Sequence, residues 1–103
     1  MNVLNDLFAT ITERKAADPS TSWTAKLLNS GPEKCAEKFG EEAVEAIIEA
    51  VKGDREKLTA EAADVLYHLL VMCASRGVTL ADIEAELAKR TARSGIAEKA
   101  DRT

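Results

Sequence analysis

Two long helical segments joined by a very short break constrain the fold of this chain more than any other feature. Residues 32–52 begin with a proline, which the first turn of a helix tolerates, and stop at Gly53, which readily takes the left-handed conformation of a helix end. Asp54 can cap a second segment that continues to Arg76 and stops at Gly77. Because so short a break makes the two helices antiparallel neighbours, the sequence predicts a long central helical hairpin.

The remaining segments also predict helices, and no stretch alternates in the manner of a β-strand. Asn2 can cap a first helix, residues 23–29 form a short one, and a last helix begins at Thr79 with a capping box. We therefore predict an all-α fold, a helical bundle built on the hairpin. One domain covers residues 1–93, and residues 94–103 form a polar C-terminal tail.

Composition and charge narrow the partners and the compartment. The net charge of −4 gives an acidic surface that repels phosphate backbones, which argues against nucleic-acid binding but not against a small phosphorylated nucleotide. The longest apolar run, residues 65–74, is too short for a membrane span, and we expect no signal peptide. Cys35 and Cys73 are expected to be reduced thiols or, alternatively, one disulfide. We therefore predict a cytoplasmic protein that does not bind membranes.

The second long helix is apolar around nearly its whole circumference. Over residues 62–74, Asp64 and His68 are the strongly polar side chains. A helix of this kind is buried on nearly all sides, and a chain of 103 residues offers little of itself to cover it. We therefore predict that the bundle is completed by homodimerisation, with this helix packed against a second copy.

Acidic side chains line the two helices of the predicted hairpin. If the chain reverses at Gly53, residues whose numbers sum to 106 lie level, so Glu45 faces Glu61 and Glu42 faces Asp64. Neighbouring carboxylates on one helix repel each other by about 0.2–0.5 kcal/mol per pair, and by more when partly buried. Mg²⁺ relieves such repulsion, because it takes a few carboxylates and completes its shell with water and phosphate oxygens. The pattern therefore predicts magnesium-assisted chemistry on a phosphate ester or anhydride.

The simpler interpretation of this acidic face is a solvated surface, with Lys34, Lys38 and Lys52 neutralising it. Asp64 weakens that interpretation, because it interrupts an apolar segment where an unpaired charge is costly. A di-iron site is disfavoured because the chain has no Glu-x-x-His motif.

These residues carry a family resemblance. The acidic pattern resembles the signature of the MazG-like all-α nucleoside triphosphate pyrophosphohydrolases: Glu41-Glu42-x-x-Glu45 followed by Glu61-x-x-Asp64. The flanking segments are similar to the phosphoribosyl-ATP pyrophosphohydrolase family of histidine biosynthesis: residues 22–28, 31–34, 38–45 and 63–70, and the tail motif Arg90-x-x-x-Ser94-Gly95-x-x-Glu98-Lys99. The resemblance spans about residues 22–102.

The resemblance implies a magnesium-dependent enzyme that hydrolyses phosphoribosyl-ATP to phosphoribosyl-AMP and pyrophosphate, the second step of histidine biosynthesis. Carried over position by position, the implied Mg²⁺ ligands are Glu42, Glu45, Glu61 and Asp64. The implied catalytic residues are Glu41, Glu42 and Lys38, and the implied substrate contacts are Lys26, Lys34, Lys38 and Lys99.

Several interpretations stay open at this point. Lys38 either pairs with the acidic face or contacts phosphate, and Trp23 either stacks on a purine or covers the core. His68 either orients Asp64 or acts as a catalytic acid. Two other functions also fit the pattern: a housekeeping nucleoside triphosphate pyrophosphohydrolase of the MazG type, and a non-enzymatic helical dimer whose acidic groove binds a partner protein.

Overall fold

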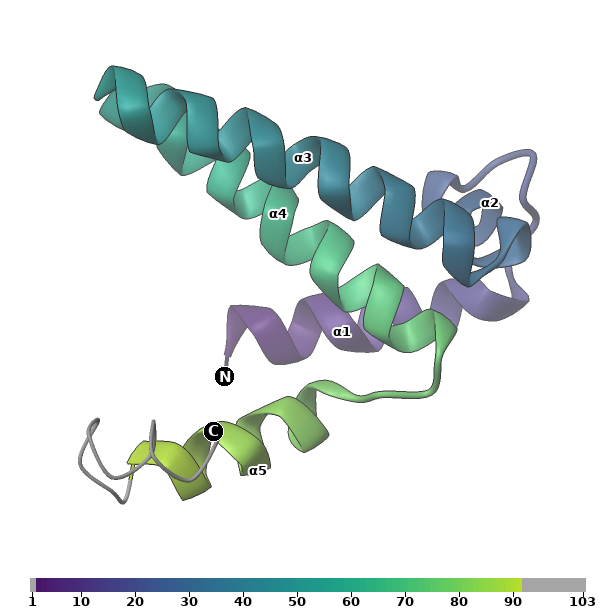
Figure 1. Ribbon diagram of the computed structural model, residues 1–103. Coiled ribbons are helices and arrows are strands. Elements are labelled where there is room, and N and C mark those ends of the chain that lie inside the picture. Colours follow the sequence, from purple (N-terminus) through teal and green to yellow (C-terminus); the bar gives the residue numbers. More distant parts are fainter. Residues whose placement is uncertain (1, 92–103) are drawn as a thin grey trace.

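The computed structural model describes residues 2–91 of the chain, which fold into five α-helices and one short 3₁₀ turn (Figure 1). In chain order the elements are α1 (Val3–Glu13), η1 (Arg14–Ala16), α2 (Trp23–Ser30), α3 (Pro32–Lys52), α4 (Arg55–Ser75) and α5 (Leu80–Thr91). Residues 2–91 contain no β-strand, so the predicted all-α class is confirmed. The predicted tail and the predicted substrate contact Lys99 lie outside the described residues.

The predicted hairpin is present. α3 and α4 pack against each other more extensively than any other pair of the described helices, and they run antiparallel from a tight turn (Figure 1). Gly53 ends α3 with φ of 80°, and its N–H donates to the Glu49 carbonyl at 3.0 Å. The Asp54 side chain caps α4 by accepting a hydrogen bond from the Lys57 N–H at 2.9 Å. Both sides of the break are therefore formed by the residues that the sequence indicated.

The buried core lies at one end of the hairpin, where α1, α2 and α5 join it. Its members are mainly aliphatic: Ile11, Leu27, Cys35, Leu70, Val71, Ala74 and Leu80. Cys35 and Cys73 are free, so the first of the two predicted thiol states is confirmed. The end of the hairpin around Gly53 extends beyond the other helices (Figure 1), and none of these core residues comes from the second half of α3.

α4 is only partly covered by its own chain, which differs from the expectation of a helix buried on nearly all sides. Leu70, Val71 and Ala74 in its C-terminal half are buried, whereas Ala62 and Ala63 in its first half, and Leu66 just past its middle, are exposed. The expectation rested on a second subunit, and the single chain leaves this half of the helix open.

Among residues 2–91, α4 is also the one helix that is long and apolar enough to span a membrane by length and composition. It carries Glu61, Asp64 and His68 near its middle, however, and ionisable groups at the centre of a bilayer are costly. It also packs against α1, α2 and α3. These features favour a helix of the packed hairpin over a membrane span.

The start of α5 has the predicted capping box. The Thr79 N–H donates to Asp82 Oδ2 at 2.9 Å, and the Asp82 N–H donates to Thr79 Oγ1 at 3.0 Å. These bonds hold the pKa of Asp82 below its usual value. The stabilisation is therefore present above the usual carboxyl range and is lost as the pH falls through the lowered pKa.

We expect Thr79→Ala to lower the free energy of unfolding at pH 7 by about 1 kcal/mol, because one helix donor loses its partner. Thermal denaturation followed by circular dichroism measures the change. Thr59→Ala is the matched control, because the Thr59 hydroxyl donates only to the Arg55 carbonyl within α4. Equal stability of the Thr79 and Thr59 variants would contradict the capping role.

Candidate active site

Three glutamates of the hairpin bring their carboxylates together. Glu42 and Glu45 lie three residues apart on α3, and Glu61 lies on α4. One oxygen from each of these side chains lies within 4.8 Å of one from each of the others. We call these three residues the acidic site. The predicted pairing of Glu45 with Glu61 across the hairpin is present, because both helices rise equally per residue from the shared turn.

The acidic site resists full ionisation when no cation is bound. The pKa of Glu42 lies above its usual value, first because burial disfavours the charged form, and then because of a hydrogen bond with Glu45 and repulsion from Glu45, Asp64 and Glu61. The pKa of Glu61 is raised by burial, by a hydrogen bond with Glu45 and by repulsion from Glu45, Asp64 and Glu49. A divalent cation would reverse both effects, because it favours the charged carboxylates.

Asp64, the fourth predicted ligand, lies beside the acidic site rather than in it. Its side chain is exposed, and it does not belong to the group of oxygens within 4.8 Å. Its charge nevertheless raises the pKa of Glu42 and Glu61. Glu49, a residue of α3 that the ligand prediction omitted, also raises the pKa of Glu61 on α4. The signal for Glu49 is its position four residues after Glu45, on the same face of α3.

The donor set fits a hard divalent cation. All three groups of the acidic site are carboxylates, and oxygen ligands are those that Mg²⁺ and Ca²⁺ prefer. Two nearby carboxylate oxygens, Glu61 Oε2 and Glu49 Oε1, are buried and have no hydrogen-bond partner among the described residues. Buried polar atoms normally have a partner, so these two oxygens are suited to a cation or its bound water.

His68 contacts the acidic site from α4. Its side chain is 7% exposed, and its Nε2 lies 4.0 Å from Glu42 Oε1. Burial lowers the pKa of His68, although Asp64 opposes the shift, so the imidazole is neutral near pH 7. The ring also packs edge-on against Tyr67, whose hydroxyl shares a hydrogen bond with the Thr24 hydroxyl of α2. His68 Nε2 therefore faces Glu42, and the charge of Asp64 also acts on the imidazole.

Comparison with known proteins identifies the family. The model of the family "Phosphoribosyl-ATP pyrophosphohydrolase" matches residues 4–91. A phosphoribosyl-ATP pyrophosphatase of Jannaschia sp. (strain CCS1) is 72% identical over 102 residues, which cover 99% of this chain and 100% of the relative. The protein of the same name from Dinoroseobacter shibae is 74% identical, with 99% of this chain and 100% of the relative covered. That of Ruegeria pomeroyi is 72% identical, with 99% and 97% covered.

The chain belongs to the phosphoribosyl-ATP pyrophosphohydrolase family.

Membership of this family confirms the resemblance found in the sequence and the predicted enzyme class, a phosphoribosyl-ATP diphosphatase of histidine biosynthesis. The match includes every described helix except the first residue of α1, so the acidic site lies well inside it.

The lysines predicted for this family's substrate lie on α2 and α3. Lys38 Nζ is 3.6 Å from Glu41 Oε1, so the predicted pairing with the acidic face is present. Lys34 Nζ pairs with Glu37 at 3.4 Å. Both pairs are partly exposed ion pairs, which contribute little to stability and leave the ammonium groups available to a stronger anion.

The raised pKa values of Glu42 and Glu61 predict how stability depends on pH and metal. A raised carboxyl pKa favours the folded state at acidic pH, and this contribution is lost as the pH rises from the ordinary value of 4.5 through the raised pKa. In EDTA, we therefore expect the melting temperature to be lower at pH 7 than at about pH 5. At pH 7, Mg²⁺ should raise it again, because Mg²⁺ at 100 times its Kd adds about 2.7 kcal/mol to the free energy of unfolding.

Differential scanning fluorimetry in EDTA and in Mg²⁺, at both pH values, measures this effect. K⁺ at equal ionic strength is the control, because it screens charge without binding in a carboxylate site. Equal stabilisation by K⁺ and Mg²⁺ would contradict a specific cation site.

Proposed function

We propose that this chain hydrolyses phosphoribosyl-ATP to phosphoribosyl-AMP and pyrophosphate at the acidic site, with Mg²⁺ as its cofactor. The convergence of Glu42, Glu45 and Glu61 from the two helices of the hairpin is the observation that carries the proposal. Such a cluster suits a substrate with several phosphates, because a bound cation joins carboxylate and phosphate oxygens. The family and the names of the relatives support the choice of phosphoribosyl-ATP.

The proposed Mg²⁺ ligands are Glu42, Glu45 and Glu61, and Asp64, whose charge acts on Glu42 and Glu61, is proposed to complete the shell directly or through water. Bound there, the cation would offset charge on the departing pyrophosphate and lower the pKa of a coordinated water. The burial and mutual repulsion that raise the pKa of Glu42 and Glu61 support this assignment, because a bound cation would offset both and favour the charged carboxylates.

The chain's own groups supply proton transfer and charge. In the proposed reaction the oxygen of water bonds to phosphorus, the bond to the pyrophosphate oxygen breaks, and a carboxylate accepts the proton of the water. Glu41 and Glu42 are the proposed acceptors: Glu42 belongs to the acidic site, and Glu41 lies outside it, where it is paired with Lys38. Lys38 is proposed to leave Glu41 and bind a phosphate when substrate arrives.

The proposed substrate contacts extend from the acidic site along α3 to α2. Lys38 is one helical turn from Glu42, and Lys34 is one further turn toward the start of α3. Lys26 lies on the neighbouring α2, which packs against α3. Lys99 remains a proposed contact from the part of the chain beyond residue 91.

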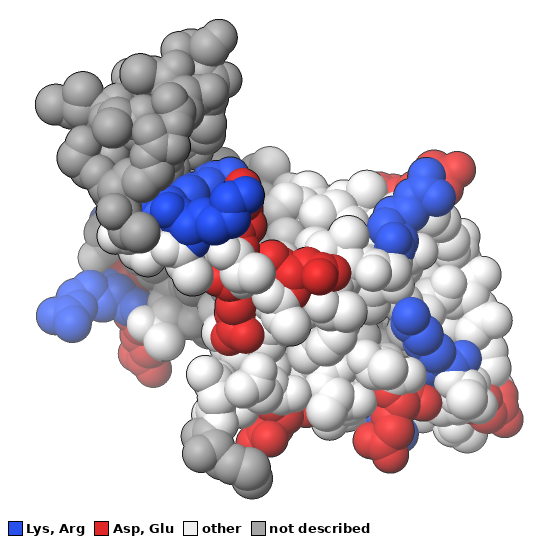
Figure 2. Space-filling view, turned by 90° about the horizontal axis from the view of Figure 1, so that it is seen from below, with Lys and Arg blue, Asp and Glu red and all other residues white. Residues whose placement is uncertain are grey.

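We propose that the protein is a homodimer. Val44, Ile47, Ile48 and Val51 form an apolar stripe on α3 at helical spacing, and they are 48–84% exposed. Figure 2 shows a further broad area on the lower face without Lys, Arg, Asp or Glu. A stripe of this size costs free energy in water, and a second copy of the same helix offers a matching apolar surface. Dimerisation would also cover the exposed first half of α4.

We propose a cytoplasmic location, supported by the two free cysteines and by a reaction that serves amino-acid biosynthesis.

A pyrophosphate-release assay on the purified full chain tests the proposed function. We expect turnover of phosphoribosyl-ATP in Mg²⁺, none in EDTA, and slower turnover of ATP or of other simple nucleoside triphosphates. Faster turnover of simple nucleotides would instead support the housekeeping enzyme of the MazG type. Turnover of none of them would support the non-enzymatic helical dimer.

A further inference from the structure

The chain's single tryptophan is placed where a core residue would not be. Trp23 is the first residue of α2 and is 50% exposed, although tryptophan is usually well buried. Leu27, one turn later on α2, and Tyr67, which is hydrogen-bonded to Thr24, pack in or against the core, but Trp23 is not among the described side chains that do. The interpretation of Trp23 as a cover for the core is therefore not supported.

Two cations lie over the indole ring. Lys26 Nζ, one turn later on α2, and Lys38 Nζ, on α3, are each 5.9 Å from the centroid of the ring. Like charges gather beside one aromatic ring at some cost, which an anionic ligand would relieve. An apolar partner surface would instead have to desolvate both ammonium groups.

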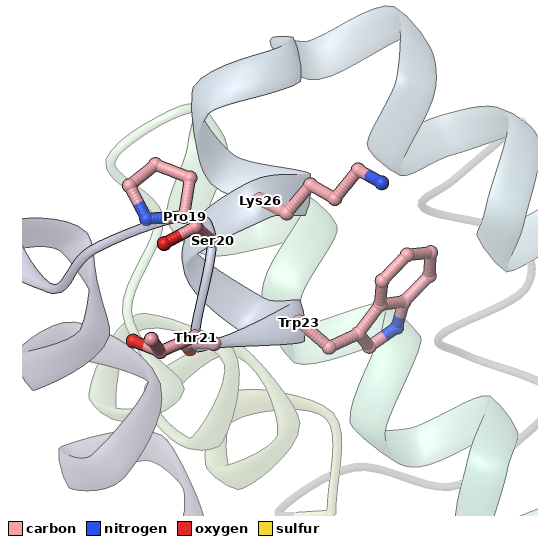
Figure 3. Close-up of a pocket in the computed structure, with 6 residues that line it drawn as sticks. Pro19, Ser20, Thr21, Trp23 and Lys26 are labelled. Atoms are coloured by element: carbon pink, nitrogen blue, oxygen red, sulfur yellow. The ribbon is translucent and has the colours of Figure 1, made fainter.

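A hollow of about 530 Å³ adjoins the ring, lined by residues 19–23 and Lys26. Figure 3 shows the indole of Trp23 and the side chain of Lys26 extending from α2 toward the same side, with Pro19 and Ser20 on the preceding loop. Asp18 holds this loop in place by accepting hydrogen bonds from the N–H and hydroxyl of Ser20 at 2.9 and 2.8 Å. The wall of the hollow is therefore formed before any ligand binds.

Lys38 connects this hollow to the acidic site. It contacts the indole of Trp23 and the carboxylate of Glu41, and it lies one helical turn, about 5.4 Å along α3, from Glu42. A ligand with phosphates at the acidic site would pass Lys38 and bring its next group to the ring. In a purine nucleotide the ribose follows the phosphates and carries the base, so the base is the group that would lie near the ring.

We infer that Trp23 is a substrate-binding residue whose indole stacks on the purine base, while Lys26 and Lys38, which lie over the ring without a ligand, turn to the substrate's phosphates. The inference rests on the proposed substrate and adds the residue that contacts its purine base. Stacking between a base and an aromatic side chain typically contributes enough affinity that its loss weakens binding about 5- to 150-fold.

Kinetics with three variants test the inference. We expect Trp23→Leu to raise the KM for phosphoribosyl-ATP about 10-fold or more with kcat within about 3-fold, because the stacking acts on binding rather than on the reacting phosphorus. Trp23→Phe, which keeps an aromatic face, should recover most of the loss. Val78→Ala, in the exposed connection between α4 and α5, is the control for a distant apolar change. An unchanged KM in Trp23→Leu, or no recovery in Trp23→Phe, would overturn the inference.

Fluorescence of the unmodified protein provides a second measurement, because Trp23 is the only tryptophan. In Mg²⁺, 5′-AMP should quench the emission, and ribose 5-phosphate at the same concentration should not, since the two differ only by the base. Equal responses would overturn the inference even if Trp23→Leu does not fold. If phosphoribosyl-ATP is not hydrolysed but AMP still quenches, the proposed function fails and the stacking role stands. If phosphoribosyl-ATP is hydrolysed normally but AMP does not quench the emission, the stacking role fails and the proposed function stands.

Discussion

Replacing Glu61 by glutamine is expected to lower kcat/KM for pyrophosphate release on the order of 100-fold or more, since removing even an outer partner of a metal ligand costs 10- to 100-fold. Glu61 is the contribution of α4 to the acidic site, and its carboxylate meets Glu42 and Glu45 from across the hairpin. An amide keeps the size of the side chain but removes the charge that holds a cation. In EDTA at pH 7 the variant should be at least as stable as the parent chain, because repulsion within the acidic site is reduced.

Glu56→Gln provides the matched control on the same helix. Glu56 lies in the exposed first turn of α4 and is not part of the acidic site, so its loss should leave activity and Mg²⁺ binding unchanged. Pyrophosphate release and Mg²⁺ titration by calorimetry separate the two variants. The metal assignment would be wrong if Glu61→Gln kept full activity, or if it lost stability in EDTA while Mg²⁺ bound normally.

Replacing Ile47 by aspartate is expected to convert a dimer into a monomer at micromolar concentration, with a dimer dissociation constant raised at least about 100-fold. Ile47 lies in the middle of the apolar stripe and is 60% exposed in the single chain. Burying a charge there without a partner costs several kcal/mol, more than the roughly 1.5–3 kcal/mol that burial of the isoleucine contributes. Sedimentation velocity over a range of concentrations measures the constant.

Val3→Asp is the control for this experiment, because Val3 is 80% exposed on α1 and lies outside the stripe. It should sediment as the unmodified protein does. A parent chain that is monomeric at micromolar concentration would refute the homodimer. A dimer that survives in Ile47→Asp would place the interface elsewhere, with the lower face of Figure 2 as the next surface to test.

The helices could be predicted from the sequence because their ends are set by local interactions. Gly53 ends α3 through its own left-handed backbone, Asp54 caps α4, and Thr79 exchanges hydrogen bonds with Asp82 at the start of α5. Each signal involves residues no more than a few positions apart, so no knowledge of distant contacts is needed. The 3₁₀ turn η1 was not predicted, since it lacks such a signal: its first residue follows α1 without a side-chain cap.

The acidic site was predicted in part for a similar reason. A constant rise per residue on both sides of a known turn sets the height of each side chain, which is why Glu45 meets Glu61. Height does not set the rotation of one helix against the other. Asp64 therefore lies beside the acidic site. Glu49, whose level partner by the same rule is Lys57, instead raises the pKa of Glu61.

By itself the sequence determined the all-α class, the central hairpin, the family and three of the carboxylates that meet, because caps, periodicity, motif and helical rise are all properties of short stretches of chain. Only the tertiary structure decided which side chains from separate helices become neighbours. Trp23 lies beside Lys38, and His68 lies beside Glu42, because of how α2 and α4 cross α3. The tertiary structure also showed that the α3 stripe is left open by its own chain, since the described core lies at the other end of the hairpin.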